Sequence, residues 1–196
     1  MTGPGTGPGA GSAGPEDPTT ELVVLLDEAG TPSGTAPKAG VHTTDTPLHL
    51  AFSCHVLDEG GRVLVTRRAL GKAAWPGVWT NAVCGHPAPG ESFADAIARR
   101  ADFELGCRVE ALECVLPDFR YRAVDDSGVV ENEVCPVYTA RIVGGPDALA
   151  PRDAEVAAWR WAEPLALGGA VRRAPFAFSP WFVRHVTELP ELYGRD

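Results

Sequence analysis

The sequence predicts an α+β protein with one compact domain behind a disordered N-terminal tail. Of its 196 residues, 44% are hydrophobic, which is enough for one core of ordinary size. Segments typical of strands come first, one helical segment follows, and more strands come after it, without regular β–α–β alternation. Residues 1–18 hold six glycines and four prolines and too few apolar side chains to offset the cost of ordering. We therefore expect a disordered tail over residues 1–18 and a folded domain over residues 19–196.

The first part of the domain predicts three strands. Residues 21–27 (ELVVLLD) are almost continuously apolar, and the turn sequence at residues 29–32 follows them. Residues 48–57 and 62–67 are separated by the tetrapeptide Asp-Glu-Gly-Gly, which favours a tight turn. These two segments therefore predict a hairpin.

The middle of the chain predicts a loop and a helix. Residues 75–89 are rich in Trp, Pro and Gly, with a short strand expected at residues 81–85. Apolar residues recur at helical spacing over residues 92–105, and Gly106 follows as a stop signal. This helix is the only long one that the pattern predicts before the C-terminal region.

The rest of the domain predicts further strands and a C-terminal helical region. The strands are expected at residues 109–115, 120–123, 129–141 and 159–161. Residues 176–193 are expected to be helical after Ser179 and Pro180, because serine is a common N-cap and proline fits the first helical turn.

Charge, hydrophobicity and cysteine content limit the partners and the location that the sequence allows. The chain has 17 basic and 26 acidic side chains and a net charge of −9, which disfavours binding of nucleic acid or of an anionic membrane by bulk charge. It contains neither an apolar run long enough to span a bilayer nor a secretory signal pattern. Its five cysteines form no CxxC pair, as is ordinary in a reducing compartment. We expect a cytoplasmic protein, and the sequence leaves its oligomeric state open.

Two charged residues share the apolar face of the predicted helix. At 100° per residue, Arg100 and Glu104 lie on the same side as Phe93 and Ile97. One interpretation is an ion pair between residues four apart near the helix end. The other is that this face borders a site where the carboxylate binds a metal and the guanidinium binds an anion.

Acidic and imidazole side chains suggest a metal site. Glu131 and Glu133 point to the same face of a predicted strand, where like charges repel unless they are exposed or share a cation. His42, His49 and His86 lie within 45 residues of one another. Each histidine alone is more often structural than a ligand. Together the five residues form a nitrogen and oxygen ligand set suited to Mn²⁺, Mg²⁺ or Zn²⁺.

Basic residues gather in an otherwise acidic chain. Lys38, Arg67, Arg68 and Lys72 are grouped as one basic cluster, and Arg100 is a candidate to join them. A solvated surface is the simple explanation for such a group. A local basic site is also what binding of a diphosphate requires.

Four segments together resemble the type I isopentenyl-diphosphate isomerases, a metal-dependent, flavin-free family with the Nudix fold. The segments are residues 42–49 (HTTDTPLH), 75–81 (WPGVWTN), 84–87 (CGHP) and 131–136 (ENEVCP). The similarity extends from about residue 21 to about residue 185. It implies a mixed sheet flanked by helices, and an enzyme of isoprenoid biosynthesis that interconverts isopentenyl diphosphate and dimethylallyl diphosphate without a flavin.

The resemblance also implies two metal sites and a substrate site. A protein-held divalent ion, Mn²⁺ or Zn²⁺ (with Mg²⁺ also open), would bind His42, His49, His86, Glu131 and Glu133. A second ion, Mg²⁺, would arrive with the substrate diphosphate and bind Glu104. The expected substrate-binding residues are Lys38, Arg68, Lys72, Arg100 and Trp181, with the tryptophan over the hydrocarbon.

For catalysis the resemblance implies Cys84, Glu133 and Tyr121. The implied reaction protonates an alkene to a tertiary carbocation and then removes a proton from the neighbouring carbon, so an acid and a base must lie on opposite faces of the substrate. We expect Glu133 with Tyr121 to deliver the proton and Cys84 to remove the second one. Trp181 is expected to stabilise the cation by cation–π attraction.

The alternative function is a Nudix diphosphate hydrolase. The Nudix signature is matched at Gly85, Glu91, Arg99, Glu104 and Gly106. Arg100 and Phe103, however, replace two of the glutamates with which hydrolytic members gather Mg²⁺ and activate water. We therefore expect weak hydrolysis at most. A non-catalytic metal-binding protein is a further alternative, but it would need neither Cys84 nor Trp181.

Overall fold

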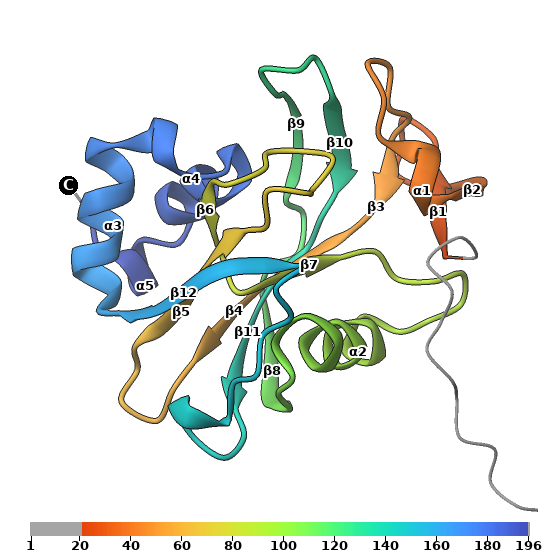
Figure 1. Ribbon diagram of the computed structural model, residues 1–196. Coiled ribbons are helices and arrows are strands. Elements are labelled where there is room, and N and C mark those ends of the chain that lie inside the picture. Colours follow the sequence, from red (N-terminus) through yellow and green to blue (C-terminus); the bar gives the residue numbers. More distant parts are fainter. Residues whose placement is uncertain (1–20, 196) are drawn as a thin grey trace, which may run out of the picture.

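A computed structural model describes residues 21–195, in which two β-sheets lie side by side and helices cover the larger one (Figure 1). The tail expected over residues 1–18 lies outside the described residues. The described chain forms one compact domain with mixed sheets and five α-helices, as the α+β prediction requires. None of these helices is long and apolar enough to cross a membrane.

The smaller sheet has five strands in the order β2-β1-β3-β10-β9. Its strands are β1 (Leu22–Leu26), β2 (Pro32–Pro37), β3 (His49–Leu50), β9 (Arg120–Val124) and β10 (Val130–Val134). Within it, β10 runs parallel to β3 and antiparallel to β9, so that Glu133 is in register with His49 on one side and with Tyr121 on the other. Three predicted site residues therefore form one row across the sheet.

The larger sheet has seven strands, of which five follow the order β12-β5-β4-β11-β8. These are β4 (Phe52–Leu57), β5 (Val63–Arg68), β8 (Val109–Leu116), β11 (Val137–Ile142) and β12 (Val156–Ala162). Two short strands, β6 (Trp79–Thr80) and β7 (Val83–Gly85), pair with β5 and β4.

Helices cover both faces of the larger sheet. They are α2 (Phe93–Leu105), α3 (Pro164–Arg173), α4 (Pro180–Glu188) and α5 (Pro190–Tyr193), whereas the one-turn helix α1 (Lys38–Val41) lies beside β1 and β2 of the smaller sheet. Two 3₁₀ turns lie at Pro146–Ala148 and Pro175–Ala177. Figure 1 shows α2 on one side of the sheet and α3–α5 on the other. Along β5, Leu64 belongs to the core with Ile97 of α2, whereas Val63 and Val65 belong to the core with Phe182 of α4. Because successive side chains of a strand point to opposite faces, β5 contributes to a hydrophobic core on each face of the sheet.

Two strands predicted as single elements are each divided between the sheets. Residues 48–57 form β3 and β4, and residues 129–141 form β10 and β11, so the prediction of one strand in each case is wrong. Pro136 lacks the N–H that a continuous ladder would use. Ala51 N–H donates to the Val134 carbonyl, and Ser53 N–H donates to the Pro136 carbonyl. The two chain segments therefore cross together, parallel to each other, from one sheet to the other.

Of the elements that the sequence analysis missed, two have sequences that disfavour them. Prolines begin and end β2, which is an edge strand where a missing N–H is tolerated. The helix α3 contains Gly168 and Gly169, which lower helix propensity. At Gly168 a Cβ would lie 2.3 Å from the Tyr193 carbonyl oxygen, so the close approach of α5 requires glycine there. In contrast, α2 has the predicted bounds, with Ser92 as N-cap and Gly106 in the left-handed conformation at φ 60°.

Candidate active site

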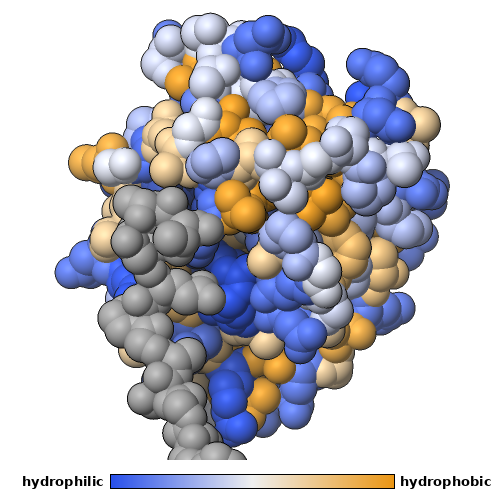
Figure 2. All heavy atoms as spheres, turned by 90° about the vertical axis from the view of Figure 1, so that its right-hand side faces the viewer, coloured by the Kyte–Doolittle hydropathy of each residue, from blue (hydrophilic) through white to orange (hydrophobic). Residues whose placement is uncertain are grey.

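A cavity of about 370 Å³ lies where the two sheets and α2 meet, and every predicted site residue except His49 lines it. Its walls include His86 beside the end of β7, Glu133 of β10 and Arg100 of α2. His49 is fully buried and lies behind His86. Figure 2 looks onto the side of the molecule that carries α1, β1 and β2, where hydrophilic residues gather between apolar patches.

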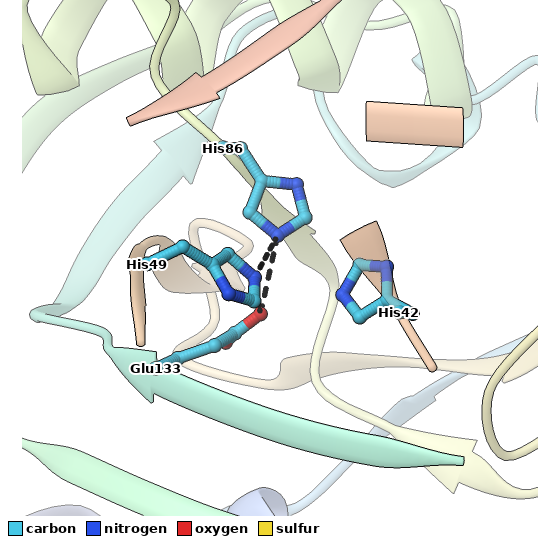
Figure 3. Close-up of side chains that lie close together, drawn as sticks. All are labelled: His42, His49, His86 and Glu133. Carbon is cyan, nitrogen blue, oxygen red and sulfur yellow. Dashed lines mark hydrogen bonds and ion pairs between the residues drawn. The ribbon is translucent and has the colours of Figure 1, made fainter. Parts of the chain in front are cut away.

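Three histidines and one glutamate from separate segments converge at this cavity. His42 follows α1, His49 lies on β3, His86 follows β7, and Glu133 lies on β10. One ligand-capable atom of each lies within 4.8 Å of all the others. Figure 3 shows the three rings and the carboxylate turned toward a shared space.

The orientation of His49 identifies the atoms that face this space. Its Nδ1 lies 2.9 Å from the Pro47 carbonyl oxygen, so Nδ1 carries the proton and Nε2 presents a lone pair. That Nε2 lies 3.2 Å from Nε2 of His86 and 3.3 Å from Oε1 of Glu133. Nε2 of His86 lies 3.1 Å from the same oxygen. Imidazole nitrogens and a carboxylate oxygen that converge in this way form a ligand set suited to a divalent cation.

Glu131 lies next to these four residues and completes the predicted set. Its Oε2 is 3.0 Å from Nε2 of His42, yet both atoms are buried without a hydrogen-bond partner among the described residues. Both Glu131 and Glu133 line the cavity, as expected for residues two apart on a strand. Buried polar atoms without partners are rare unless an ion or water satisfies them. The residues present therefore fit a divalent metal ion.

Burial and the close approach of the side chains shift the pKa values of the cluster. Burial lowers the pKa of His86 to about 4, so the imidazole is neutral, as a ligand must be. Burial acts to raise the pKa of Glu133, but contacts with His49 and His86 outweigh it and hold that pKa well below the usual range. Burial and the neighbouring Glu133 raise the pKa of Glu131. Two carboxylates this close are most stable when they share a cation.

A thiol lies on another wall of the cavity. Sγ of Cys84 on β7 is 3.2 Å from Nδ2 of Asn81 and 3.4 Å from Oγ of Ser53. Burial raises the pKa of the thiol to about 11, although hydrogen bonds from Ser53 and Asn81 oppose the shift. Cys84 is thus a protonated thiol at neutral pH, held by two polar side chains.

A phenol, a carboxylate and an indole form a further wall. The hydroxyl of Tyr121 donates to Oε2 of Glu133 at 2.8 Å. The ring of Trp181 lies 5.7 Å from that of Tyr121, and its Nε1–H donates to Oδ1 of Asn81 at 3.1 Å. Asn81 therefore connects the two predicted site residues Cys84 and Trp181.

The four predicted anion-binding residues all line the cavity: Lys38, Arg68, Lys72 and Arg100. Arg68, at the end of β5, donates to the carbonyl oxygens of Ala74 and Trp75, and its guanidinium lies 5.4 Å from the centre of the Trp181 ring. The cationic part of the cavity therefore adjoins its aromatic part.

Arg100 and Glu104 form the ion pair of the first interpretation, and they lie at a cavity, as the second interpretation requires. They are 5% and 9% exposed and form an ion pair with each other, and both line the cavity. Arg67, in contrast, is exposed and donates to the Gly77 carbonyl, so the structure does not bring it to the site with the other basic residues.

The sequence analysis did not single out several further residues that line the cavity, among them Glu21, Asn81 and Glu155. Asn81 lies within the segment WPGVWTN, and this motif could have identified it as a site residue. Glu21 opens the first strand segment and Glu155 precedes the last strand, and neither position carries a motif. Only the fold shows that these carboxylates face Lys38 and Lys72.

Comparison with known proteins identifies the relationship. Residues 47–182 match the NUDIX domain family. The chain is 61% identical to an isopentenyl-diphosphate Delta-isomerase of Paenarthrobacter aurescens over 88% of this chain and 92% of that protein. It is 62% identical to an isopentenyl-diphosphate Delta-isomerase of Leifsonia xyli over 90% of this chain and 94% of that protein.

Solved structures share the fold at much lower identity. DR0079 from Deinococcus radiodurans has a TM-score of 0.64 at 18% identity, covering 85% of this chain and 98% of that one. A MutT protein from Methanosarcina mazei has a TM-score of 0.55 at 15% identity, covering 74% of this chain and 94% of that one. The sequence relatives and the shared fold together show that this chain belongs to the isopentenyl-diphosphate Delta-isomerase family, within the NUDIX domain proteins.

Proposed function

We propose that this protein interconverts isopentenyl diphosphate and dimethylallyl diphosphate by protonation and deprotonation. One observation carries the proposal: the Cys84 thiol and the Tyr121–Glu133 pair line the same cavity as four cationic side chains. The cavity thus combines two proton-transfer groups with an anion site. The reaction needs both, because it moves a double bond in a substrate that is held by its diphosphate.

The cations would hold the diphosphate beside the aromatic wall. Arg68 is fixed by the carbonyl groups of Ala74 and Trp75, and Trp181 lies against it. Bound in this way, the short hydrocarbon of the substrate would extend from the cationic residues toward Trp181 and Tyr121. A guanidinium that is already fixed loses little conformational freedom on binding.

The histidines and glutamates of the cluster would hold a divalent ion, Mn²⁺ or Zn²⁺ in our assignment, and Glu104 would hold Mg²⁺ together with the diphosphate. A bound ion would supply positive charge that fixes the orientation and acidity of the Glu133 carboxyl group. The evidence for the first site is the converging Nε2 and Oε1 atoms of His49, His86 and Glu133.

Proton transfer is assigned to the two groups described above. The Tyr121–Glu133 pair, in which the hydroxyl donates to the carboxylate, would deliver the proton to the alkene. Cys84 would accept the second proton as a thiolate, after it has lost its own proton to bulk water before the substrate binds. The Asn81 Nδ2–H that points at the sulfur favours that ionised form. In the reverse direction the same groups exchange roles.

The carbocation needs an environment that stabilises it and excludes water. Trp181 is 2% exposed, and its π face offers up to about 2 kcal/mol of attraction to a desolvated cation. Its indole is oriented by the hydrogen bond to Asn81. The described cysteines are free thiols, which fits a catalytic thiol and the cytoplasmic location expected from the sequence.

The test is an NMR measurement of purified protein with isopentenyl diphosphate, Mg²⁺ and Mn²⁺ in deuterated water. We expect dimethylallyl diphosphate with deuterium in its methyl group. Released phosphate without isomerised product would instead indicate hydrolysis, against which the replacement of two signature glutamates by Arg100 and Phe103 already argues.

A further inference from the structure

The cations of the anion site are not free in this structure, because carboxylates contact three of the four. Lys38 pairs with Glu21, and Lys72 pairs with Glu155. Arg100 pairs with Glu104 and lies 3.5 Å from Oε2 of Glu155. Of these four residues, only Arg68 forms no ion pair with a carboxylate among the described residues.

The fold holds both unassigned carboxylates in place. The backbone carbonyl of Glu155 accepts from Ala69 N–H, and Lys72 N–H donates to the Ala69 carbonyl, so Glu155 and Lys72 are linked through one turn. The backbone carbonyl of Glu21 accepts from Lys38 N–H. Each ion pair is thus supported by the backbone of its own two segments.

The contacts of Glu21 favour its ionised form. Burial acts to raise the pKa of Glu21, but the hydrogen bond and charge of Lys38, with Arg100 and Arg99, lower it below its usual value. Burial acts to lower the pKa of Arg100, but Glu104, Glu155 and Glu21 raise it. Four basic and three acidic side chains line this part of the cavity, so its formal net charge is about +1.

A metal-free diphosphate does not match that charge. A diphosphate ester carries about −3 at neutral pH, because its terminal phosphate is largely doubly ionised. It would make the filled site strongly negative and would also have to displace or approach two carboxylates. A diphosphate complexed with a divalent cation carries about −1, which the site neutralises.

We propose that Glu21 and Glu155 are specificity-determining residues that make the site take a diphosphate only together with a divalent cation and reject the metal-free anion. The identity of the anion rests on the proposed function. Without these two carboxylates, the same four cations would bind a bare diphosphate strongly. With them, the positive charge of the cation is required for tight binding.

The proposed role and a purely supporting role predict opposite effects of removing Glu155 on the binding of metal-free diphosphate. If Glu155 served only to hold Lys72 and Arg100 in position, its removal would weaken diphosphate binding with and without the cation. If it opposes the metal-free anion, its removal strengthens metal-free binding, because one repulsive charge is lost.

The experiment is calorimetric titration of the full chain, with its tightly held metal left in place, using inorganic diphosphate as the probe. Wild type, Glu21→Gln and Glu155→Gln are titrated in buffer without Mg²⁺ and in buffer with saturating Mg²⁺. Glu188→Gln is the matched control, because it also removes one ion-paired carboxylate, that of the exposed Arg184–Glu188 pair, and does not line the cavity. Metal content and thermal stability are measured for each protein.

For wild type and the control we expect tight binding only with Mg²⁺. Each glutamine variant should bind metal-free diphosphate about tenfold more tightly than wild type, so that its dependence on Mg²⁺ falls. Unchanged or weaker metal-free binding in both variants would overturn the proposal. Conversion of isopentenyl diphosphate by the same wild-type preparation tests the proposed function separately: its absence, with cation-dependent diphosphate binding intact, would contradict the function and not the role of these carboxylates.

Discussion

The hydroxyl of Tyr121 donates a 2.8 Å hydrogen bond to Oε2 of Glu133, whose other carboxylate oxygen faces the histidine cluster. The two residues are opposite each other in register on β9 and β10. One carboxylate therefore connects the candidate metal centre to a proton-carrying phenol. Removing the phenolic oxygen separates these two roles.

Tyr121→Phe should lower kcat by about 10²-fold to 10⁴-fold, the usual contribution of a positioned acid or base. The metal content should stay as in wild type, because the Glu133 oxygen nearest the histidines is Oε1 and Tyr121 contacts Oε2. Steady-state kinetics and elemental analysis of the same sample check both statements. A variant that turns over normally would remove Tyr121 from the mechanism.

Cys84→Ala should abolish turnover while the metal content and the unfolding temperature stay near those of wild type. The thiol contacts Ser53 and Asn81 but is not among the atoms that converge as metal ligands. Cys84→Ser keeps the size and a hydrogen-bonding group but has a much weaker tendency to ionise, so it should also be nearly inactive. Near-normal activity in either variant would rule out the thiol as a proton-transfer group.

The residues of these two predictions were available from the sequence, because short motifs carry them. The helix α2 and the strands β1 and β5 could also be predicted, since each is a local pattern with clear end signals. The division at Ala51 and Pro136 could not, because whether an apolar segment stays in one sheet depends on its partner strand. The partner strand divides at the same place, which no local pattern records.

The charge balance of the site could likewise not be predicted from the sequence. The basic residues were identified as a group in sequence, but the carboxylates that face them come from distant positions, Glu21 and Glu155. Ion pairs between segments that are far apart along the chain leave no periodic signal. The sequence therefore predicted a local basic site, and only the fold shows that carboxylates nearly balance its charge.

Glu104→Gln should raise the Mg²⁺ concentration needed for half-maximal activity by about tenfold or more, because an ionised ligand for a hard cation is lost. Stability should change little, since Arg100 keeps its contacts with Glu155 and Glu21. Asp102→Asn, an exposed change of equal charge on the same helix, is the control. If both variants show the wild-type Mg²⁺ dependence, Glu104 serves only as the ion-pair partner of Arg100.

His86→Asn should lose most of the metal held by the cluster, because Nε2 of His86 contacts both His49 and Glu133. Removing the metal from wild type with a chelator should lower the unfolding temperature, since a ligand bound only by the folded state stabilises it. The same chelator should shift His86→Asn much less. Scanning calorimetry with and without chelator measures this difference. Equal shifts for the two proteins would mean that the chelator acts elsewhere.

Two buried histidines away from the cavity should make the fold sensitive to acid. His55 and His185 are fully buried with ring centres 5.2 Å apart, and His55 Nδ1 lies 2.8 Å from the Tyr193 hydroxyl. Burial lowers the pKa of His55 to about 3. Burial, followed by His55 and Arg184, lowers the pKa of His185 well below its usual value. Both rings are therefore neutral in the folded protein and take up protons on unfolding in mild acid.

The direction in which stability changes with pH follows from proton uptake on unfolding. Below about pH 6.5 the unfolded chain binds a proton at each of these histidines and the folded chain does not, so stability falls as the pH falls. His185→Leu removes one such group, and neither of its ring nitrogens has a hydrogen-bond partner among the described residues. As the pH falls from about 6 to about 4.5, the unfolding free energy of wild type should therefore fall faster than that of this variant. The difference between the two slopes should be about 1.4 kcal/mol per pH unit. Urea unfolding across this range measures it, with the exposed Thr187→Ala on the same helix as the control. Parallel stability curves for wild type and His185→Leu would show that His185 is protonated in the folded protein as readily as in the unfolded chain.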